Sequence, residues 1–150
     1  MENLQKINDQ ITIAGQPSPD DLRELSAKGI RTVVNLRTLD EPGQDDEERI
    51  VEGQGITYAS IPVSPQTLDD AAVERFIQAL ASVDGTPALV HCKGGGRAGV
   101  MTLLHLAIQN GWSLQQTLEH GQTIGITPSE TSPYRAFFDD FIKRHSPAER

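Results

Sequence analysis

The sequence predicts a single α/β domain with a mainly parallel central sheet of about four to five strands, helices on both faces and a helical C-terminal third. Two observations lead to this fold class. Short apolar runs of strand-forming residues alternate with capped amphipathic segments, which is the order of consecutive β–α–β units. The chain has 150 residues, the length of one ordinary domain, so residues 1–150 are expected to share one core.

Four strands are predicted from apolar, β-branched runs that turn residues delimit. They span residues 11–14, 30–36, 56–63 and 88–91. Ligand sites in open parallel sheets lie beyond the carboxyl ends of the strands. The residues that directly follow 88–91 are therefore the first place to expect a site.

Capping patterns predict where three of the helices begin. Ser18 and Thr67 each start a capping box, which Asp21 and Asp70 complete, and Ser113 caps a third helix. The helix that begins after Ser18 is expected to run as far as the stop signal at Gly29.

Hydrophobic spacing predicts the other helices. A short helix is expected around residues 47–52, and a helix that is apolar on nearly every side at 100–108. Two further helices carry apolar stripes, the first made of Val73, Phe76, Ile77, Leu80 and Val83, and the second of Tyr134, Phe137, Phe138, Phe141 and Ile142.

Charge and cysteine content limit the class of protein. The formal net charge is −8, so no nucleic-acid or membrane partner is expected. Cys92 is the only cysteine, and no cluster of cysteine and histidine indicates a metal site, which favours a reducing compartment. The sequence has no signal-peptide pattern and no apolar run long enough to span a bilayer, so the expected location is cytoplasmic. The oligomeric state stays open.

Residues 87–99, PALVHCKGGGRAG, join the last predicted strand to the buried helix. A glycine-rich loop before a helix N-terminus points unpaired backbone N–H groups and the positive end of the helix dipole at a ligand, so it binds anions. The same field favours the thiolate form of a cysteine. Arg97 adds a permanently charged fork that fits phosphate oxygens. We therefore predict that Cys92 is a nucleophile and that Arg97 is an anion clamp.

Two other interpretations of this stretch are weaker. Gly94, Gly96 and Gly99 match the dinucleotide pattern G-x-G-x-x-G, but about 20 residues further on, where that pattern needs an acidic strand end, the chain is still predicted to be helical. A buried structural cysteine is the simplest alternative, because free cysteines are often buried. A structural turn, however, rarely needs three glycines together with a lysine and an arginine.

On His91, Cys92, Arg97 and Gly99 the chain resembles the protein tyrosine phosphatase superfamily, whose signature is His-Cys, five residues, Arg, then Ser or Thr and Gly. The segments GQPSPDDLRELSAKGIRTVVNLR and YASIPV are similar to a small dual-specificity-like bacterial phosphatase domain, which is also found fused to beta-lactamase-type hydrolase domains. The resemblance covers roughly residues 10–110.

This resemblance implies a phosphatase-like fold and cysteine-dependent hydrolysis of phosphomonoesters, without a cofactor. Cys92 would attack phosphorus, Arg97 and the loop amides would hold the phosphate oxygens, and water would release phosphate from a phosphocysteine. The partner would be a phosphorylated protein, on phosphotyrosine for example, or a phosphorylated small molecule. The predicted substrate-binding residues are Lys93, Gly94, Gly95, Gly96, Ala98 and Gly99.

No motif marks the general acid that the resemblance requires. In the family it is an Asp on the loop after the strand that corresponds to YASIPV, and here Ser64 stands near that place. Asp69 is the first candidate, although it also suits the first turn of a helix. Asp40, Glu41 and Asp45, in the loop after the second predicted strand, are the alternatives.

The chain departs from the family pattern at two places. Four residues, not five, separate Cys92 from Arg97, and Ala98 replaces a hydroxyl residue that in the family helps the thiolate to leave. The shorter loop resembles that of rhodanese-like sulfurtransferases, so a persulfide on Cys92 is an alternative function. A phosphate-binding module with weak turnover is a second alternative.

The remaining candidates are expected to be structural. His91 would support the loop by hydrogen bonds, and His105 would be a satisfied core histidine. His120 and Gln122 are expected at the surface. The aromatic residues expected in the core are Trp112, Tyr134, Phe137 and Phe138.

Overall fold

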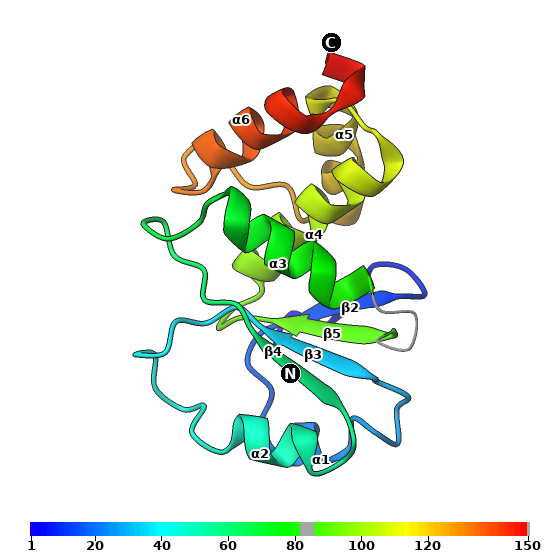
Figure 1. The fold of residues 1–150 in the computed structure, drawn as a ribbon, viewed down its shortest axis with the longest axis vertical. Helices are drawn as coiled ribbons and strands as arrows, with labels where there is room; N and C mark the ends of the chain where they lie inside the picture. Colours follow the sequence, from blue (N-terminus) through cyan, green and yellow to red (C-terminus); the bar gives the residue numbers. More distant parts are fainter. Residues whose placement is uncertain (82–85, 150) are drawn as a thin grey trace.

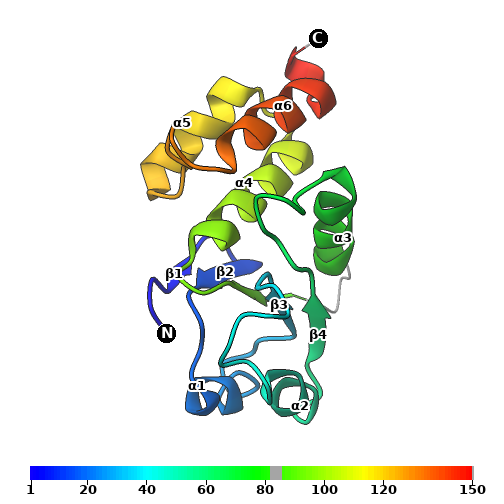
Figure 2. The same ribbon diagram turned by 90° about the vertical axis from the view of Figure 1, so that its left-hand side faces the viewer.

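The structure is a computed structural model that describes residues 1–81 and 86–149. At its centre is a five-stranded sheet with the order β1–β2–β5–β3–β4 (Figure 1 and Figure 2). The strands are β1 (Gln5–Lys6), β2 (Ile11–Ala14), β3 (Thr32–Asn35), β4 (Thr57–Ser60) and β5 (Ala88–His91). β1 runs antiparallel to β2, and the other neighbouring strands are parallel. The predicted mainly parallel sheet is confirmed, and the two-residue edge strand β1 is an addition that no apolar run marks.

Helices cover both faces of the sheet, as predicted (Figure 2). On one face lie α1 (Pro19–Arg23) and α2 (Glu47–Glu52). On the other lie α3 (Asp70–Ala81) and α4 (Gly96–Asn110), with α5 (Leu114–Ile124) and α6 (Arg135–His145) packed against α4. A short 3₁₀ turn, η2 (Pro147–Glu149), follows α6. None of the helices in the described ranges has both the length and the apolar composition that a bilayer crossing needs.

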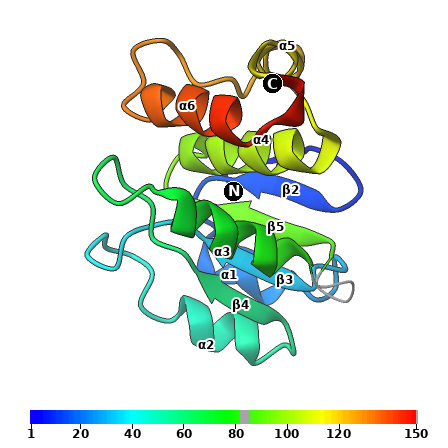
Figure 3. The same ribbon diagram turned by 45° about the horizontal axis from the view of Figure 1, so that its top comes forward.

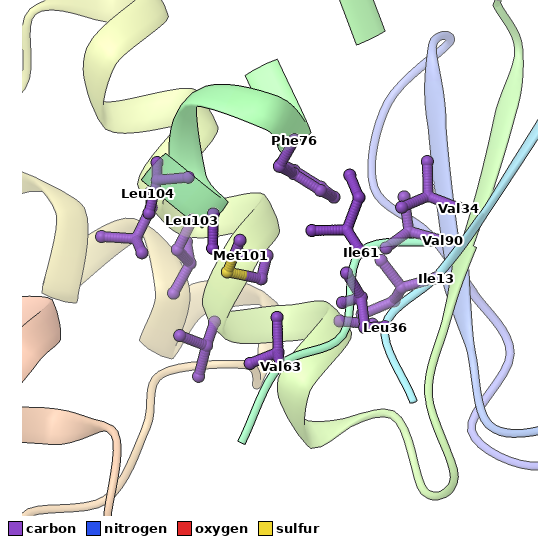
Figure 4. Packing of buried hydrophobic residues seen from close by; sticks show 14 of the residues in the cluster. Ile13, Val34, Leu36, Ile61, Val63, Phe76, Val90, Met101, Leu103 and Leu104 are labelled. Atoms are coloured by element: carbon purple, nitrogen blue, oxygen red, sulfur yellow. The ribbon is translucent and has the colours of Figure 1, made fainter. Parts of the chain in front are cut away.

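The inner strands β2, β3 and β5 are buried on both faces of the sheet. Successive side chains of a strand point to opposite faces, so each of these strands contributes to both. Val34 and Val90 join a cluster that contains side chains of α3, α4 and α6 (Figure 4). Their chain neighbours Val33 and Leu89 join a second cluster with α1 and α2. Both faces of these strands are apolar because each face packs against its own hydrophobic core.

Helix α4 is the central helix of the larger core, between the sheet and the pair α5 and α6 (Figure 3). All residues from Ala98 to Ala107 are buried, which confirms the helix predicted at 100–108. The helix begins earlier than predicted, at Gly96, so Arg97 lies in its first turn. His105 is almost buried and meets Phe76 edge-on, as expected for a core histidine.

The predicted capping boxes at Ser18 and Ser113 are confirmed. The helix after Ser18 is shorter than predicted, because α1 ends at Arg23 and turns carry the chain to Gly29. The strands at 30–36 and 56–63 are likewise shortened to four residues each. Val83, the last residue of the stripe predicted for α3, lies outside the described residues.

The capping box predicted at Thr67 is wrong. The hydroxyl of Thr67 accepts a hydrogen bond from the backbone N–H of Ser64, three residues before it, and so closes a turn. Asp69 caps α3 instead, because its carboxylate accepts the backbone N–H of Ala72 at 2.8 Å. Asp70 turns outward and pairs with Arg144 of α6 at 2.7 Å.

Candidate active site

Cys92 lies directly after β5, at the carboxyl edge of the parallel strands, where the chain turns back into α4 (Figure 1). Neighbouring strands hold the backbone at this point. The N–H of Cys92 donates to the carbonyl of Ala14 at 3.3 Å, and the carbonyl of His91 accepts the N–H of Leu36 at 2.9 Å. The thiol therefore stands where open parallel sheets place their ligand sites.

The start of α4 has no side-chain cap. Its N-cap residue is Gly95, whose φ of 98° is in the left-handed region that favours glycine. The N–H of Gly95 donates to Cys92 Sγ at 3.0 Å. We call residues 92–97 the cup, because their backbone curves around the sulfur and the helix dipole is directed at it. The sulfur of Cys92 therefore lies at the uncapped N-terminus of α4.

The guanidinium of Arg97 is held at the edge of the cup by two partners. Nη1 and Nη2 donate to the two carboxylate oxygens of Glu41, each at 2.8 Å, and Nη1 also donates to the carbonyl of Val63 at 3.1 Å. These bonds use three of the five guanidinium N–H groups. Within the described residues, the Nε–H and the second Nη2–H, which share one edge of the guanidinium, have no protein acceptor.

The Arg97–Glu41 pair is charged. The Arg97 guanidinium holds the pKa of the Glu41 carboxyl well below its usual value, and donating hydrogen bonds to Glu41 raises the pKa of Arg97. An ionised Glu41 is an acceptor and not a proton donor. Glu41, one of the alternative acids named from the sequence, therefore orients the arginine.

A cleft of about 720 Å³ opens over the cup. Of the predicted site residues, it is lined by Cys92, Gly94, Gly95, Gly96, Arg97 and Gly99. The cleft walls come from residues 3–5, 125–129 and 132–134. Lys93 is exposed and Ala98 is buried in the core, and neither lines the cleft. The structure thus brings together Cys92, Arg97 and four of the six residues that the sequence predicts to bind substrate.

Asp69 is not among the residues that line the cleft; it is exposed at the start of α3. In the described part of the chain, no aspartate or glutamate lines the cleft. Tyr134 does line it, so this residue, predicted to be in the core, is only half-buried and faces the site. Burial raises the pKa of its hydroxyl, which stays protonated at neutral pH.

The other aromatic and polar candidates lie as expected or close to it. Phe138 is fully buried, while Phe137 and Trp112 pack at the margin of the core. His120 stacks against Trp112 with ring centroids 4.7 Å apart, and Gln122 is exposed.

His91 is fully buried, and its role differs from the predicted one. Its Nε2 lies 2.6 Å from Oε2 of Glu47 on α2, not against the loop. Although burial opposes ionisation of Glu47, the hydrogen bonds from His91, Gln16 and Tyr58 keep its pKa below the usual value. Nε2 is therefore the donor in this pair. The acidic segment 40–48 thus supplies a buried carboxylate, Glu47, behind the cup.

Comparisons with known proteins identify a matching family model and several similar sequences. A family model described as PTP-SAK, Swiss Army Knife protein, DSP-PTPase phosphatase domain, matches residues 8–137. A beta-lactamase hydrolase-like protein of Agrobacterium fabrum is 36% identical over 124 residues, 80% of this chain and 28% of the relative. The dual specificity protein phosphatase TpbA of Pseudomonas aeruginosa is 26% identical, over 82% of this chain and 55% of TpbA. The chain thus spans 28% and 55% of these two relatives.

Solved structures share the fold. A crystal structure of a DUF442 protein from Shewanella putrefaciens has a TM-score of 0.80 and 24% identity, over 97% of this chain and 95% of that one. A crystal structure of TpbA in complex with pTyr has a TM-score of 0.71 and 21% identity, over 97% and 91% of the two chains. Both are phosphatase folds, as the sequence predicts.

Proposed function

The chain belongs to the DSP-PTPase phosphatase family and is a phosphatase-type hydrolase, and from this premise we propose that it cleaves phosphate monoesters through a phosphocysteine on Cys92. One observation carries the proposal. The sulfur of Cys92 accepts the N–H of Gly95 at the uncapped start of α4, with Arg97 one turn away. This arrangement supplies a nucleophile and a preorganised positive environment for the charge of a phosphoryl group.

The reaction has two displacements. In the first, the Cys92 thiolate attacks phosphorus, an S–P bond forms, the ester P–O bond breaks, and the leaving oxygen takes up a proton. In the second, water attacks phosphorus, a P–O bond forms, the S–P bond breaks, and the thiolate returns while water gives up a proton. Neither displacement needs a redox partner.

Arg97 is suited to hold the phosphoryl group during both steps. Two N–H groups of Arg97 donate to neither Glu41 nor Val63, and both lie on one edge of the guanidinium. Two parallel N–H donors match two phosphate oxygens. Glu41 would then fix the arginine without competing for that edge. The charge of the phosphate would be neutralised locally, although the protein carries a net charge of −8.

The proton donor for the leaving oxygen stays a prediction. Asp69 remains the candidate named from the sequence, and Asp40 and Asp45 remain alternatives. Glu41 is a poor candidate, because Arg97 keeps it ionised. Replacing each aspartate by asparagine, and measuring hydrolysis of a substrate whose leaving group needs a proton, distinguishes among them.

We propose that the substrate is an aryl phosphate. It would be carried by a protein, as phosphotyrosine, or by a small phosphorylated molecule. TpbA has been crystallised with pTyr. Apart from Cys92 and Arg97, the described side chains that line the cleft are neutral at pH 7, and Tyr134 offers an aromatic surface beside the cup. Such walls suit a monophosphate on an uncharged aromatic group better than a polyanion.

Phosphate release from a small aryl phosphate, measured for the wild type and for Cys92→Ser, tests the proposal. We expect Cys92→Ser to lower kcat by at least ~10³-fold, the scale of loss when an essential nucleophile is removed. Equal rates would contradict the proposal. A mass gain of one sulfur on Cys92 after incubation with thiosulfate, without phosphate release, would favour the sulfurtransferase alternative, and phosphate binding without turnover would favour the binding module.

A further inference from the structure

Arg37, two residues beyond β3, is a buried arginine that the mechanism above does not use. Only 3% of its surface is exposed. Its Nε donates to Oε1 of Glu41 at 3.2 Å, its Nη1 to Oε1 of Gln16 at 2.7 Å, and its Nη2 to the carbonyl of Pro42 at 2.7 Å. All three guanidinium nitrogens thus have acceptors behind the cup.

Through its first contact, Arg37 is linked to Arg97, because both arginines donate to Glu41. Glu41 receives Arg37 on one side and the Nη1 and Nη2 groups of Arg97 on the other. The N–H and the hydroxyl of Thr38 donate to the same carboxylate at 2.7 and 2.9 Å. The bond to the Pro42 carbonyl also fixes the backbone next to Glu41. Glu41 is therefore held in one orientation, and it presents both oxygens to Arg97.

The second contact of Arg37 leads to the residue before the nucleophile. Gln16, whose Oε1 accepts from Arg37, donates through Nε2 to Oε1 of Glu47 at 2.7 Å. The other oxygen of Glu47 binds His91, the residue next to Cys92. The chain of hydrogen bonds from Arg37 thus reaches both sides of the cup, through Glu41 to Arg97 and through Gln16 to His91.

We propose that Arg37 is a positioning residue for the anion site: it holds Glu41, and through Glu41 it fixes the Arg97 guanidinium with its Nε/Nη2 edge toward the cup. The inference rests on the proposed function only in that Arg97 is the group that binds the phosphate. A buried arginine is expensive to desolvate unless its geometry is fully satisfied, and here each acceptor belongs to a group that supports the cup. Such support improves an anion site by restricting the clamp to one geometry.

The test measures the Kd for inorganic phosphate by calorimetry, so that it does not depend on turnover. We expect Arg37→Met to weaken phosphate binding about 10-fold, and Arg37→Lys less, because a lysine keeps the charge but not the three directed donors. Glu41→Gln, which keeps the size of the side chain, is expected to weaken binding to a similar extent. Arg144→Met, which breaks an arginine–carboxylate pair far from the cup, is the matched control and is expected to bind phosphate like the wild type.

A double-mutant cycle separates positioning from general damage to the fold. If Arg37 acts through Arg97, Arg37→Met should have little further effect on phosphate binding when Arg97→Met is already present, so the two losses are strongly non-additive. Additive losses, unchanged binding in both Arg37 variants, or tighter binding in Glu41→Gln would each overturn the proposal. If Arg37→Met does not fold, the same cycle is run with Arg37→Lys. Failure of the proposed function would appear elsewhere, as equal hydrolysis by the wild type and Cys92→Ser.

Discussion

The N-termini of α3 and α4 lie on the same side of the sheet, yet they are completed in opposite ways. At α3, the carboxylate of Asp69 accepts the N–H of Ala72, and Asp70 in the first turn pairs with Arg144. At α4, the N-cap is Gly95, which offers no side chain, and the nearest acceptor is the sulfur of Cys92. The α3 start is capped by a carboxylate of its own segment, and the α4 start leaves its N–H groups and its dipole available to an anion.

This difference distinguishes a helix N-terminus that is only structural from a helix N-terminus that binds a ligand. The unpaired N–H groups of a first turn need acceptors, which caps normally supply. Glycines in place of a cap, a cysteine just before them and an arginine just after them indicate that the missing acceptor is a ligand.

Among the substitutions within the two helices and their caps, the largest loss is expected from Arg97→Lys, which removes the directed N–H edge at the α4 start. Removing one preorganised donor from an oxyanion site typically costs about 10²–10³-fold in kcat, and we expect a loss near the lower end because the charge is kept. Steady-state hydrolysis of an aryl phosphate measures it. A kcat within a factor of two of the wild type would mean that the arginine is no clamp.

Gly95→Ala is expected to have the next largest effect. An alanine at φ of +98° is strained, and its Cβ would lie 3.4 Å from the Cβ of Asn3, so we expect a loss of roughly 1–2 kcal/mol in the free energy of unfolding together with weaker phosphate binding. Urea denaturation and calorimetry measure the two quantities. For the free energy of unfolding, Gly94→Ala is the matched control, because nothing lies within 4 Å of its added Cβ and its φ is not in the left-handed region. Equal losses in both variants would contradict the account of the cup.

Two substitutions at Asp69 distinguish a role in capping α3 from a role as the general acid. Asp69→Ala removes the cap of α3 and should cost about 1 kcal/mol in the free energy of unfolding, whereas Asp69→Asn keeps a good cap. If Asp69 only caps the helix, both variants hydrolyse an aryl phosphate like the wild type. If Asp69 is also the general acid, both lose activity, and the stable Asp69→Asn variant shows that the loss is chemical.

The smallest effect concerns the pH dependence of stability at the α3 start. The guanidinium of Arg144 lowers the pKa of Asp70 from 3.8 to about 2. A carboxyl whose pKa is lower in the folded state contributes stability above its unfolded pKa, and loses it as pH falls from about 4 to about 2. Because the pair is half-exposed, we expect only a slight effect. Thermal unfolding from pH 5 to pH 2 should show a smaller decrease in Tm for Arg144→Met than for the wild type, and parallel curves would count against the pair.

Most of the fold follows from local sequence signals. The alternation of strands and helices, the buried α4 and the boxes at Ser18 and Ser113 are all as predicted, because each depends on residues close together in the chain. Element ends are less predictable. The box at Thr67 fails because Ser64, three residues earlier, competes for its hydroxyl, and because Asp69 is also a good cap.

The site is predictable only where it lies within one segment. Cys92, the glycines and Arg97 are consecutive in the sequence, and the cup follows from them. Arg37, Glu41 and Glu47 take their roles from contacts with residues up to 56 positions away, so no spacing in the sequence marks them. Tyr134 was expected in the core from its place in a helical stripe, but it stands at the edge of that stripe, where the core meets the cleft.

In the proposed mechanism, the open start of α4 makes Cys92 a phosphoryl acceptor. Rapid quenching of the wild type during turnover of a phosphate-labelled aryl phosphate, followed by peptide mapping, locates the phosphoryl group. We expect up to one labelled phosphoryl group per chain, located on Cys92, and none in Cys92→Ser. Label on another residue, or hydrolysis that continues in Cys92→Ser, would contradict this mechanism.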